Sequence, residues 1–70
     1  MNYQLMNTVS QQRKTKSVTQ EELAEKVDVS RQTIIAIEKG NYTPSVLLAL
    51  KISHYFRTHV EDIFTVQYEK

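Results

Sequence analysis

The sequence predicts a mainly α-helical fold that is extended by a small antiparallel β-sheet formed from the two ends of the chain. Gly40 and Pro44, the one glycine and the one proline, stand close together, so the rest of the 70 residues contains few helix breakers. Side chains that cap helices precede segments in which apolar residues have a helical spacing. Near the two ends, apolar and polar residues alternate instead, which is the period of a strand.

Length and composition limit the kind of protein that this chain can be. Its 70 residues are expected to form one domain, residues 1–70, whose core suffices for a helical bundle but not for a deep substrate cleft. Without cysteine, the chain can form neither a disulfide nor a thiolate metal site. No apolar run has the length of a membrane span, and the first residues do not resemble a signal peptide. We therefore expect a cytoplasmic protein that is not an enzyme and has no cofactor, metal or small-molecule ligand.

The first two helices are predicted from their N-terminal ends. Residues 8 to about 16 form the first helix, in which Val9 is the clear apolar anchor. The second helix starts with the capping box TQEE, in which the Thr19 hydroxyl accepts from the backbone of Glu22 and the Glu22 carboxylate reaches back. This helix ends near residue 27, and its inward-facing residues are Leu23, Ala24 and Val27.

The segment VSRQTIIAIEKG, residues 29–40, predicts a third helix after a short turn. Ser30 is its cap, and Gly40 is placed to end it in a left-handed turn. Ile34 and Ile37 give it a buried stripe. The third helix therefore follows the second with only a tight turn between them.

A fourth helix is predicted to start with Thr43 as cap and Pro44 at the first helical position, and to continue through SVLLALKISHYF. It has enough apolar residues to be the most buried helix. A short fifth helix is predicted at about residues 60–64. The alternating apolar residues at the two ends are Met1, Tyr3 and Leu5, and Phe64, Val66 and Tyr68. Two short strands that pair with each other explain both patterns.

Two helices joined by a turn of three or four residues, the second with a polar first turn, form the helix-turn-helix arrangement. In the major groove of DNA, residues at the N-terminal end of such a helix reach the base edges. Arg31 can bind guanine O6 and N7, and Gln32 can bind adenine N6 and N7, each worth about 1–3 kcal/mol of discrimination. From these two residues alone, a solvated helix end is an equally good interpretation. The basic residues near the first helix would suit a surface that meets phosphate, although the net charge is only +1 and charges scattered for solubility explain them equally well.

From residue 19 to residue 64 the chain resembles the Cro/repressor-type (XRE-like) helix-turn-helix family of bacterial and phage regulators. The segments TQEELAEKV, VSRQTIIAIEKG, YTPS, LALKIS and VEDIF follow in family order and spacing. The alternating ends also resemble a subgroup of small repressors in which N- and C-terminal strands form a sheet. The resemblance implies a five-helix, lambda-repressor-like domain that binds a double-stranded DNA operator, usually as a homodimer on a two-fold site.

The resemblance also implies roles for individual residues. Base contacts are implied for Ser30, Arg31, Gln32, Ile35 and Ala36, with thymine methyl groups as targets of Ile35. Phosphate contacts, which position the protein on DNA, are implied for Arg13, Gln20, Thr33, Lys39, Asn41, Tyr42 and Thr43. Gln20 can also brace Arg31 or Gln32. Arg13 and Glu38 match an ion pair between the first and third helices. Asp28 stands where a turn glycine is common, so we expect it in a left-handed conformation.

The remaining conspicuous side chains have simpler interpretations. His54 and His59 lack a third ligand at metal spacing, so a metal site is not expected. The aromatic residues are expected in the core or at a dimer interface rather than in a base-stacking platform. The expected dimer contacts are Leu47, Phe64, Val66 and Tyr68.

The leading prediction is a repressor that acts on the nucleoid in the cytoplasm of a bacterium or of a phage-infected host. Two alternatives stay open. One is a protein-interaction module, such as an antitoxin or adaptor, on the same fold. The other is an architectural protein that is indifferent to DNA sequence. Steep salt dependence with a large ratio of specific to nonspecific affinity would favour the regulator.

Overall fold

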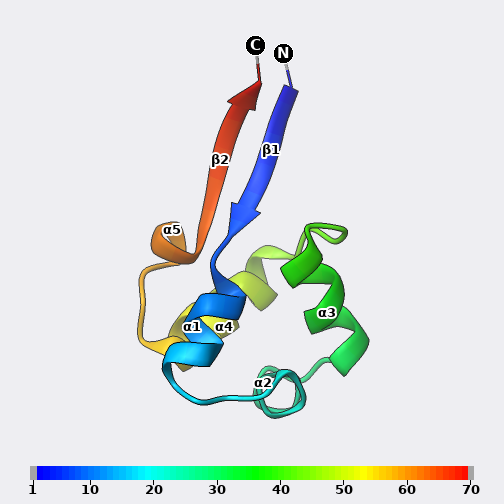
Figure 1. The fold of residues 1–70 in the computed structure, drawn as a ribbon, viewed down its shortest axis with the longest axis vertical. Coiled ribbons are helices and arrows are strands. Elements are labelled where there is room, and N and C mark those ends of the chain that lie inside the picture. The colour runs from blue at the N-terminus through cyan, green and yellow to red at the C-terminus, as the bar shows by residue number, and fades with distance from the viewer. Residues whose placement is uncertain (1, 70) are drawn as a thin grey trace.

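The computed structural model describes residues 2–69 and arranges five helices in a bundle from which two strands project (Figure 1). The elements follow one another as β1 (Asn2–Asn7), α1 (Val9–Thr15), α2 (Gln20–Lys26), α3 (Arg31–Lys39), α4 (Val46–Phe56), α5 (Val60–Ile63) and β2 (Phe64–Glu69). The predicted fold class, mainly α with five helices and a small terminal sheet, is confirmed. Of the alternating residues, Met1 lies outside the described part of the chain.

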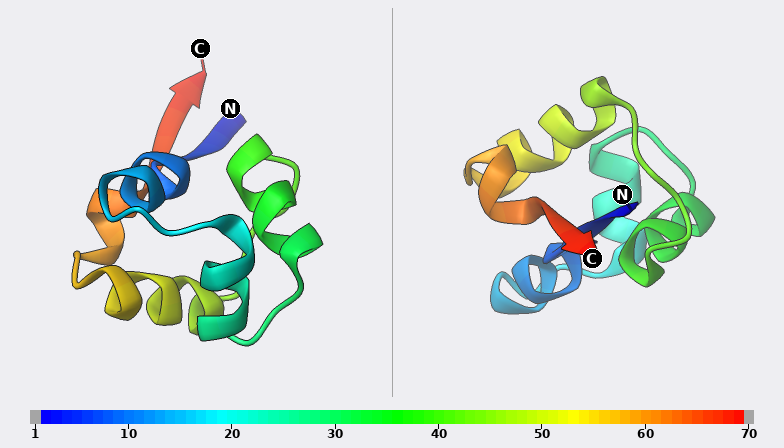
Figure 2. Two further views of the ribbon diagram at one scale, coloured as in Figure 1. Left: turned by 60° about the horizontal axis from the view of Figure 1, so that its bottom comes forward. Right: turned by 90° about the horizontal axis from the view of Figure 1, so that it is seen from above.

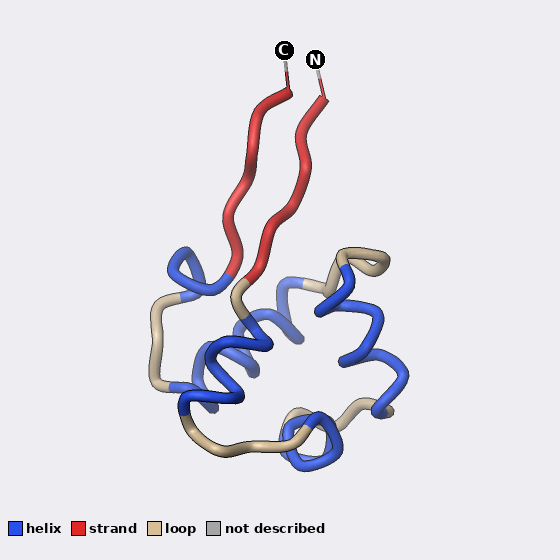
Figure 3. Tube along the Cα trace, viewed as in Figure 1, coloured by secondary structure: helices blue, strands red, loops and turns tan. Residues whose placement is uncertain are grey.

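The two strands form an antiparallel sheet that brings the ends of the described chain together. Tyr3 pairs with Tyr68, Leu5 with Val66, and Asn7 with Phe64, so these six side chains share one face. At the far end of the sheet, the Tyr3 and Tyr68 hydroxyls are 2.6 Å apart and the ring centroids 4.5 Å. This hydrogen bond raises the pKa of Tyr3 above its ordinary value. Figures 1 and 3 show that most of the sheet extends beyond the helices.

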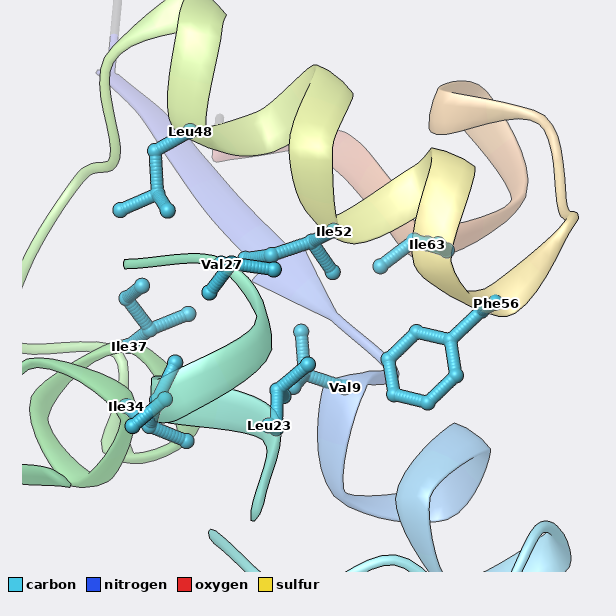
Figure 4. Packing of buried hydrophobic residues seen from close by; sticks show 10 residues of the cluster. Val9, Leu23, Val27, Ile34, Ile37, Leu48, Ile52, Phe56 and Ile63 are labelled. Carbon is cyan, nitrogen blue, oxygen red and sulfur yellow. The ribbon is translucent and has the colours of Figure 1, made fainter. Parts of the chain in front are cut away.

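The hydrophobic core lies between the helices, and all five helices contribute to it (Figure 4). Ile34 and Ile37 anchor α3 in this core and are at most 1% exposed. Figure 2 shows α1 and α4 on opposite sides of the bundle. The fully buried side chains are Val9, Leu23, Val27, Ile34, Ile37, Ile52, Phe56 and Ile63. The apolar positions predicted to face inward in the first three helices are therefore confirmed.

The predicted start of the fourth helix is wrong. The helix begins at Val46 with Ser45 as its cap, and the Ser45 hydroxyl accepts a hydrogen bond from Leu48 N at 3.1 Å. Thr43 and Pro44 lie in the preceding loop. Serine is among the best N-cap residues because its short side chain reaches the N–H groups of the first turn. The helix therefore begins at Val46, two residues later than the predicted start at Pro44.

The other predicted boundaries are close to those observed. The first helix covers Val9–Thr15, within the predicted residues 8 to about 16. The fifth ends at Ile63, one residue early, because Phe64 pairs with Asn7 and begins β2. The predicted capping box at Thr19 and the left-handed residue at Gly40 are both present.

Candidate nucleic-acid interface

The turn between α2 and α3 has the geometry of a helix-turn-helix. The capping box starts α2, with Glu22 N donating to Thr19 Oγ1 and Thr19 N donating to Glu22 Oε1, both at 3.0 Å. The bonds from the Thr19 backbone and side chain lower the pKa of Glu22. In the turn, Asp28 has φ 68°, as expected, and Val29 N donates to Ala24 O at 3.0 Å. These local bonds fix the direction in which α3 leaves α2.

In the first turn of α3, Ser30 and Thr33 form the hydrogen bonds of the N-cap, whereas Arg31 and Gln32 take no part in them. The Ser30 hydroxyl accepts from Thr33 N at 3.3 Å and is hydrogen-bonded to the Thr33 hydroxyl at 3.1 Å. Arg31 and Gln32 are exposed, and neither takes part in a side-chain hydrogen bond among residues 2–69. One turn further, Ile35 and Ala36 are partly exposed. The helix thus presents two long polar side chains whose donors form no hydrogen bond within residues 2–69.

Glu38, in the last turn of α3, connects three helices. Arg13 Nε donates to Glu38 Oε2 at 2.7 Å, and Arg13 Nη2 donates to Oε1 at 3.0 Å. Gln20 Nε2 also donates to Glu38 Oε1, at 3.1 Å, and Arg13 Nη1 donates to Val18 O at 3.0 Å. The Arg13 and Glu38 side chains are only 11% and 9% exposed. This network holds α1, α2 and α3 together, and Gln20 braces Glu38 rather than Arg31 or Gln32.

The electrostatics of this network favour the charged forms of both partners. Burial raises the pKa of Glu38, but the hydrogen bonds from Arg13 and Gln20 and the Arg13 charge outweigh it, so the pKa lies below its ordinary value. The hydrogen bond to Glu38 raises the pKa of Arg13. The pair is consequently ionised at neutral pH. The pair stabilises the packing of α1 against α3, because removal of one partner would leave a largely buried charge.

A basic groove of about 750 Å³ lies where α1, α2 and α3 meet. Three cations and one acid border it, and Ser17, with φ 56°, forms the bend at the end of α1. Its lining residues are Arg13, Lys14, Ser17, Val18, Thr19, Gln20, Glu21 and Arg31. The structure thus brings together Arg13, Gln20 and Arg31 from the predicted contacts.

Lys14, which also borders the groove, was not predicted as a contact. The sequence signal was the run of basic residues before the first acid, but the run does not tell which members face a ligand. Lys16, from the same run, donates to Phe56 O at 2.9 Å and so caps the end of α4 instead.

Four of the other predicted phosphate contacts lie at the end of α3 and in the loop between α3 and α4. Gly40, with φ 80°, ends α3, and Asn41 N donates back to Ala36 O at 2.9 Å. Tyr42 is 48% exposed. The exposed predicted contacts around this loop are Lys39, Asn41, Tyr42 and Thr43. They lie at the opposite end of α3 from Arg31 and Gln32.

The residues predicted at a dimer interface fall on two surfaces. Leu47, on α4, is 64% exposed, and Val66 and Tyr68, on β2, are 62% and 56% exposed. Phe64 is partly buried and packs against the core. The expected dimer contacts therefore divide between an α4 surface and the apolar face of the sheet.

Residues 2–69 contain no helix that is both long and apolar enough to cross a membrane. Within the same residues, no three His, Asp or Glu side chains gather as a metal site would require. His54 and His59 border a shallow hollow between α4 and α5.

The tight α2–α3 turn, the exposed first turn of α3 and the adjacent basic groove together define a helix-turn-helix DNA-binding domain. A family model described as Helix-turn-helix matches residues 9–63. A regulator named as HTH-type from Methanocaldococcus jannaschii is 53% identical over 60 residues, which cover 86% of this chain and 91% of that protein. The HTH-type regulator YgzD of Bacillus subtilis is 48% identical over 65 residues, covering 93% of this chain and 98% of YgzD.

Solved structures agree with this comparison. The clp gene regulator ClgR from Corynebacterium glutamicum has a TM-score of 0.73 and 31% identity, and the match covers 77% of this chain but only 57% of ClgR. The transcriptional regulator VanUg has a TM-score of 0.78 over 99% of this chain and 92% of its own, at 21% identity, and so shows the fold alone. The chain belongs to the XRE-like helix-turn-helix family of transcriptional regulators, which are not enzymes.

Proposed function

We propose that the protein is a repressor that binds a two-fold operator in double-stranded DNA as a homodimer, with one α3 helix in each of two successive major grooves. The observation that carries this proposal is the exposure and the hydrogen bonding of the side chains in the first turn of α3. Arg31 and Gln32 are exposed and form no side-chain hydrogen bond in the described part of the chain, while Ser30 and Thr33 are hydrogen-bonded to each other at the cap. A helix whose unused donors stand at its N-terminal end suits the major groove.

The DNA sequence would be read by Arg31, by Gln32 and by the next turn of α3. Arg31 suits guanine and Gln32 suits adenine, since each can form two hydrogen bonds to one base. Ile35, which is partly exposed, suits a thymine methyl group. Ser30 and Ala36 complete the proposed base-contacting set.

Phosphate contacts are proposed at both ends of α3. Arg13 and Gln20 keep N–H donors that Glu38 and Val18 do not use, because guanidinium has five and carboxamide two. Lys14 adds a third donor at the same groove. At the other end, the proposed contacts are Lys39, Asn41, Tyr42 and Thr43, and Thr33 lies between the two groups. Contacts at both ends would fix the register of α3 without specifying sequence.

The homodimer is proposed because apolar surface is exposed. On the sheet, Tyr3, Val66 and Tyr68 are each more than half exposed on one face. On α4, Val46 is 77% and Leu47 64% exposed. A stable interface buries about 800 Å² on each partner, and a two-fold dimer would place two recognition helices about 34 Å apart on one side of DNA.

A second candidate function is a module that holds a partner protein. The α4 surface supports it, because a shallow apolar groove of about 470 Å³ lies there, lined by Leu47, Leu50, Lys51, His54 and Tyr55. An amphipathic helix of a partner fits a groove of this kind.

For the leading proposal, the site of action is the nucleoid in the cytoplasm, in a bacterial or phage-infected host.

Selection of binding sites from randomised duplex DNA tests the proposal. The purified protein is expected to select a two-fold symmetric sequence and to bind it at least a thousandfold more tightly than a scrambled duplex. Titrations at two salt concentrations distinguish sequence-specific binding from binding by charge alone. Binding by charge alone depends on salt but has similar affinities for the selected and the scrambled duplex. Absence of any selected motif would refute the proposed function, and pull-down with the α4 surface intact or mutated would then test the second candidate.

A further inference from the structure

Asn7, the last residue of β1, connects the terminal sheet to α3. Its Nδ2 donates to Ile37 O, in the last turn of α3, at 2.9 Å. Its Oδ1 accepts from Val9 N, the first residue of α1, at 3.1 Å. Among the hydrogen bonds of residues 2–69, no other joins either strand to α3. One carboxamide therefore links the end of β1 to the start of the adjacent α1 and to α3, whose bonded residue lies 30 positions further along the chain.

The C-terminal end of α3 provides a carbonyl oxygen, Ile37 O, that can accept the hydrogen bond from Asn7. Gly40 N donates to Ile37 O at 3.0 Å and Asn41 N donates to Ala36 O at 2.9 Å, which is the Schellman pattern. A carbonyl oxygen has two lone pairs, so Ile37 O can accept from Gly40 and Asn7 together. The Asn7 side is fixed as well, because Thr8 N donates to Ile63 O at 2.9 Å.

We infer that Asn7 is a positioning residue for DNA recognition, which holds α3 at the angle that base reading requires. The inference rests on the proposed function. The helix has nine residues and is about 13 Å long, so a tilt of about 5° moves its far end by about 1 Å. Arg31 stands at that far end. A shift of this size takes a base contact outside the range of about 2.7–3.2 Å in which a hydrogen bond is strong.

Attraction to phosphate charge depends much less on such a shift. Nonspecific binding comes almost entirely from this attraction. Loss of the Asn7 donor should therefore weaken binding to the selected duplex and leave binding to a scrambled duplex unchanged. Since one hydrogen bond is at stake in each protomer, we expect the ratio of the two affinities to fall at least roughly three- to tenfold.

Three variants of the full chain isolate this effect. Asn7→Asp removes the donor to Ile37 but keeps an acceptor for Val9 N, so α1 can begin as before. Asn7→Ala removes both bonds. Asn2→Asp is the matched control, because Asn2 is exposed on the same strand and acquires the same charge. Affinities for the selected and scrambled duplexes are measured at one salt concentration, at a temperature where circular dichroism shows every variant to be folded.

The expected result is a lower ratio for both Asn7 variants and a wild-type ratio for Asn2→Asp. Hydrogen exchange at the Gly40 and Asn41 amides, in the protein without DNA, should be faster in the Asn7 variants alone. An unchanged ratio overturns the inference, as does an equal loss on both duplexes, which a smaller folded fraction or the added charge would produce. Failure of the proposed function gives a different result, in which the wild-type protein itself binds both duplexes equally, and the inference then fails with it.

Discussion

At the scale of single residues, Arg31 and Lys14 border the same groove but are expected to act differently on DNA. Arg31→Ala should relax the preference at one base pair in each half-site and cost about 1–3 kcal/mol of specific binding, because a bidentate contact is lost. Lys14→Ala should weaken binding to all sequences alike and lower the salt slope by about one, because it removes one phosphate contact. Repeating the binding-site selection and the salt titration with each variant checks both.

The two variants serve as controls for each other. A binding-site profile for Arg31→Ala that matches the wild type would contradict the base-reading role. A changed profile for Lys14→Ala would show that its side chain reaches base edges and not only phosphate.

The ion pair of Glu38 gives a prediction about pH. The pKa of Glu38 is lower in the folded protein than in the unfolded chain, so its contribution to stability is present above about pH 4.5, the ordinary value, and is lost as the pH falls through the folded pKa. Glu38→Gln should cost about 2 kcal/mol near pH 7, because Arg13 loses a charged partner. The difference in the free energy of unfolding between wild type and variant should shrink from pH 6 to pH 3, as measured by urea titration.

Glu25→Gln is the control, because Glu25 is exposed and makes no side-chain hydrogen bond among the described residues. Its effect on stability should stay within about 0.5 kcal/mol at every pH. If the Glu38→Gln difference did not depend on pH, the carboxylate charge would not be what stabilises this network.

At this scale, the side-chain contacts that could be predicted are those between residues close together in the sequence. The Thr19 and Ser30 caps depend on partners three residues away, so a short pattern contains all the information. Gln20 and Asn7 have partners 18 and 30 residues away, and these contacts exist only once the helices are packed. An asparagine just before the first helix is a usual capping signal, but nothing in it indicates a bond to the third helix.

At the scale of elements, the start of α4 is open to a direct test. Ser45→Ala should lower the free energy of unfolding by about 1 kcal/mol, since Leu48 N loses its acceptor. Thr43→Ala, two residues earlier in the loop, should change it by less than about 0.5 kcal/mol. Thermal and urea unfolding of the two variants give the comparison, and an equal loss in both would contradict Ser45 as the cap.

The other elements were predicted where their ends carry strong signals. The capping box, the glycine and the alternating ends each have one structural interpretation, and the structure agrees with them. Before α4, two acceptable caps stand close together, and local propensity does not rank them. The helix must direct Leu48, Ile52 and Phe56 into the core, and Ser45 is the cap that the packed helix uses.

At the scale of the whole molecule, the apolar face of the sheet gives a prediction about association. Val66→Glu should raise the dissociation constant of the proposed dimer at least tenfold, because it places like charges in a two-fold interface. Gln67→Glu is the control, since residue 67 points to the opposite face of the same strand. Sedimentation equilibrium measures both, and a Val66→Glu protein as dimeric as the wild type would exclude this face from the interface.

The arrangement of the five helices was predicted from the family resemblance of five linked segments, and the comparisons confirm that resemblance. Helix periodicity alone does not select this arrangement, since many bundles satisfy the same apolar pattern. Association stays a prediction. The exposed residues Leu47 and Val66 lie on different elements, and the sequence contains nothing that decides between the two surfaces.

The pairing of the two ends also has a consequence for the order of folding. Tyr3 and Tyr68 are separated by 65 positions, so their contact closes a long loop and must offset a large entropy cost. The helices, whose contacts are more local, can form and pack first. During synthesis β1 leaves the ribosome before the helices but has no partner until β2 emerges. The strand that carries Asn7 is thus made before the helices and is among the last elements to reach its final place, so the bond that orients α3 would form only after the rest of the bundle.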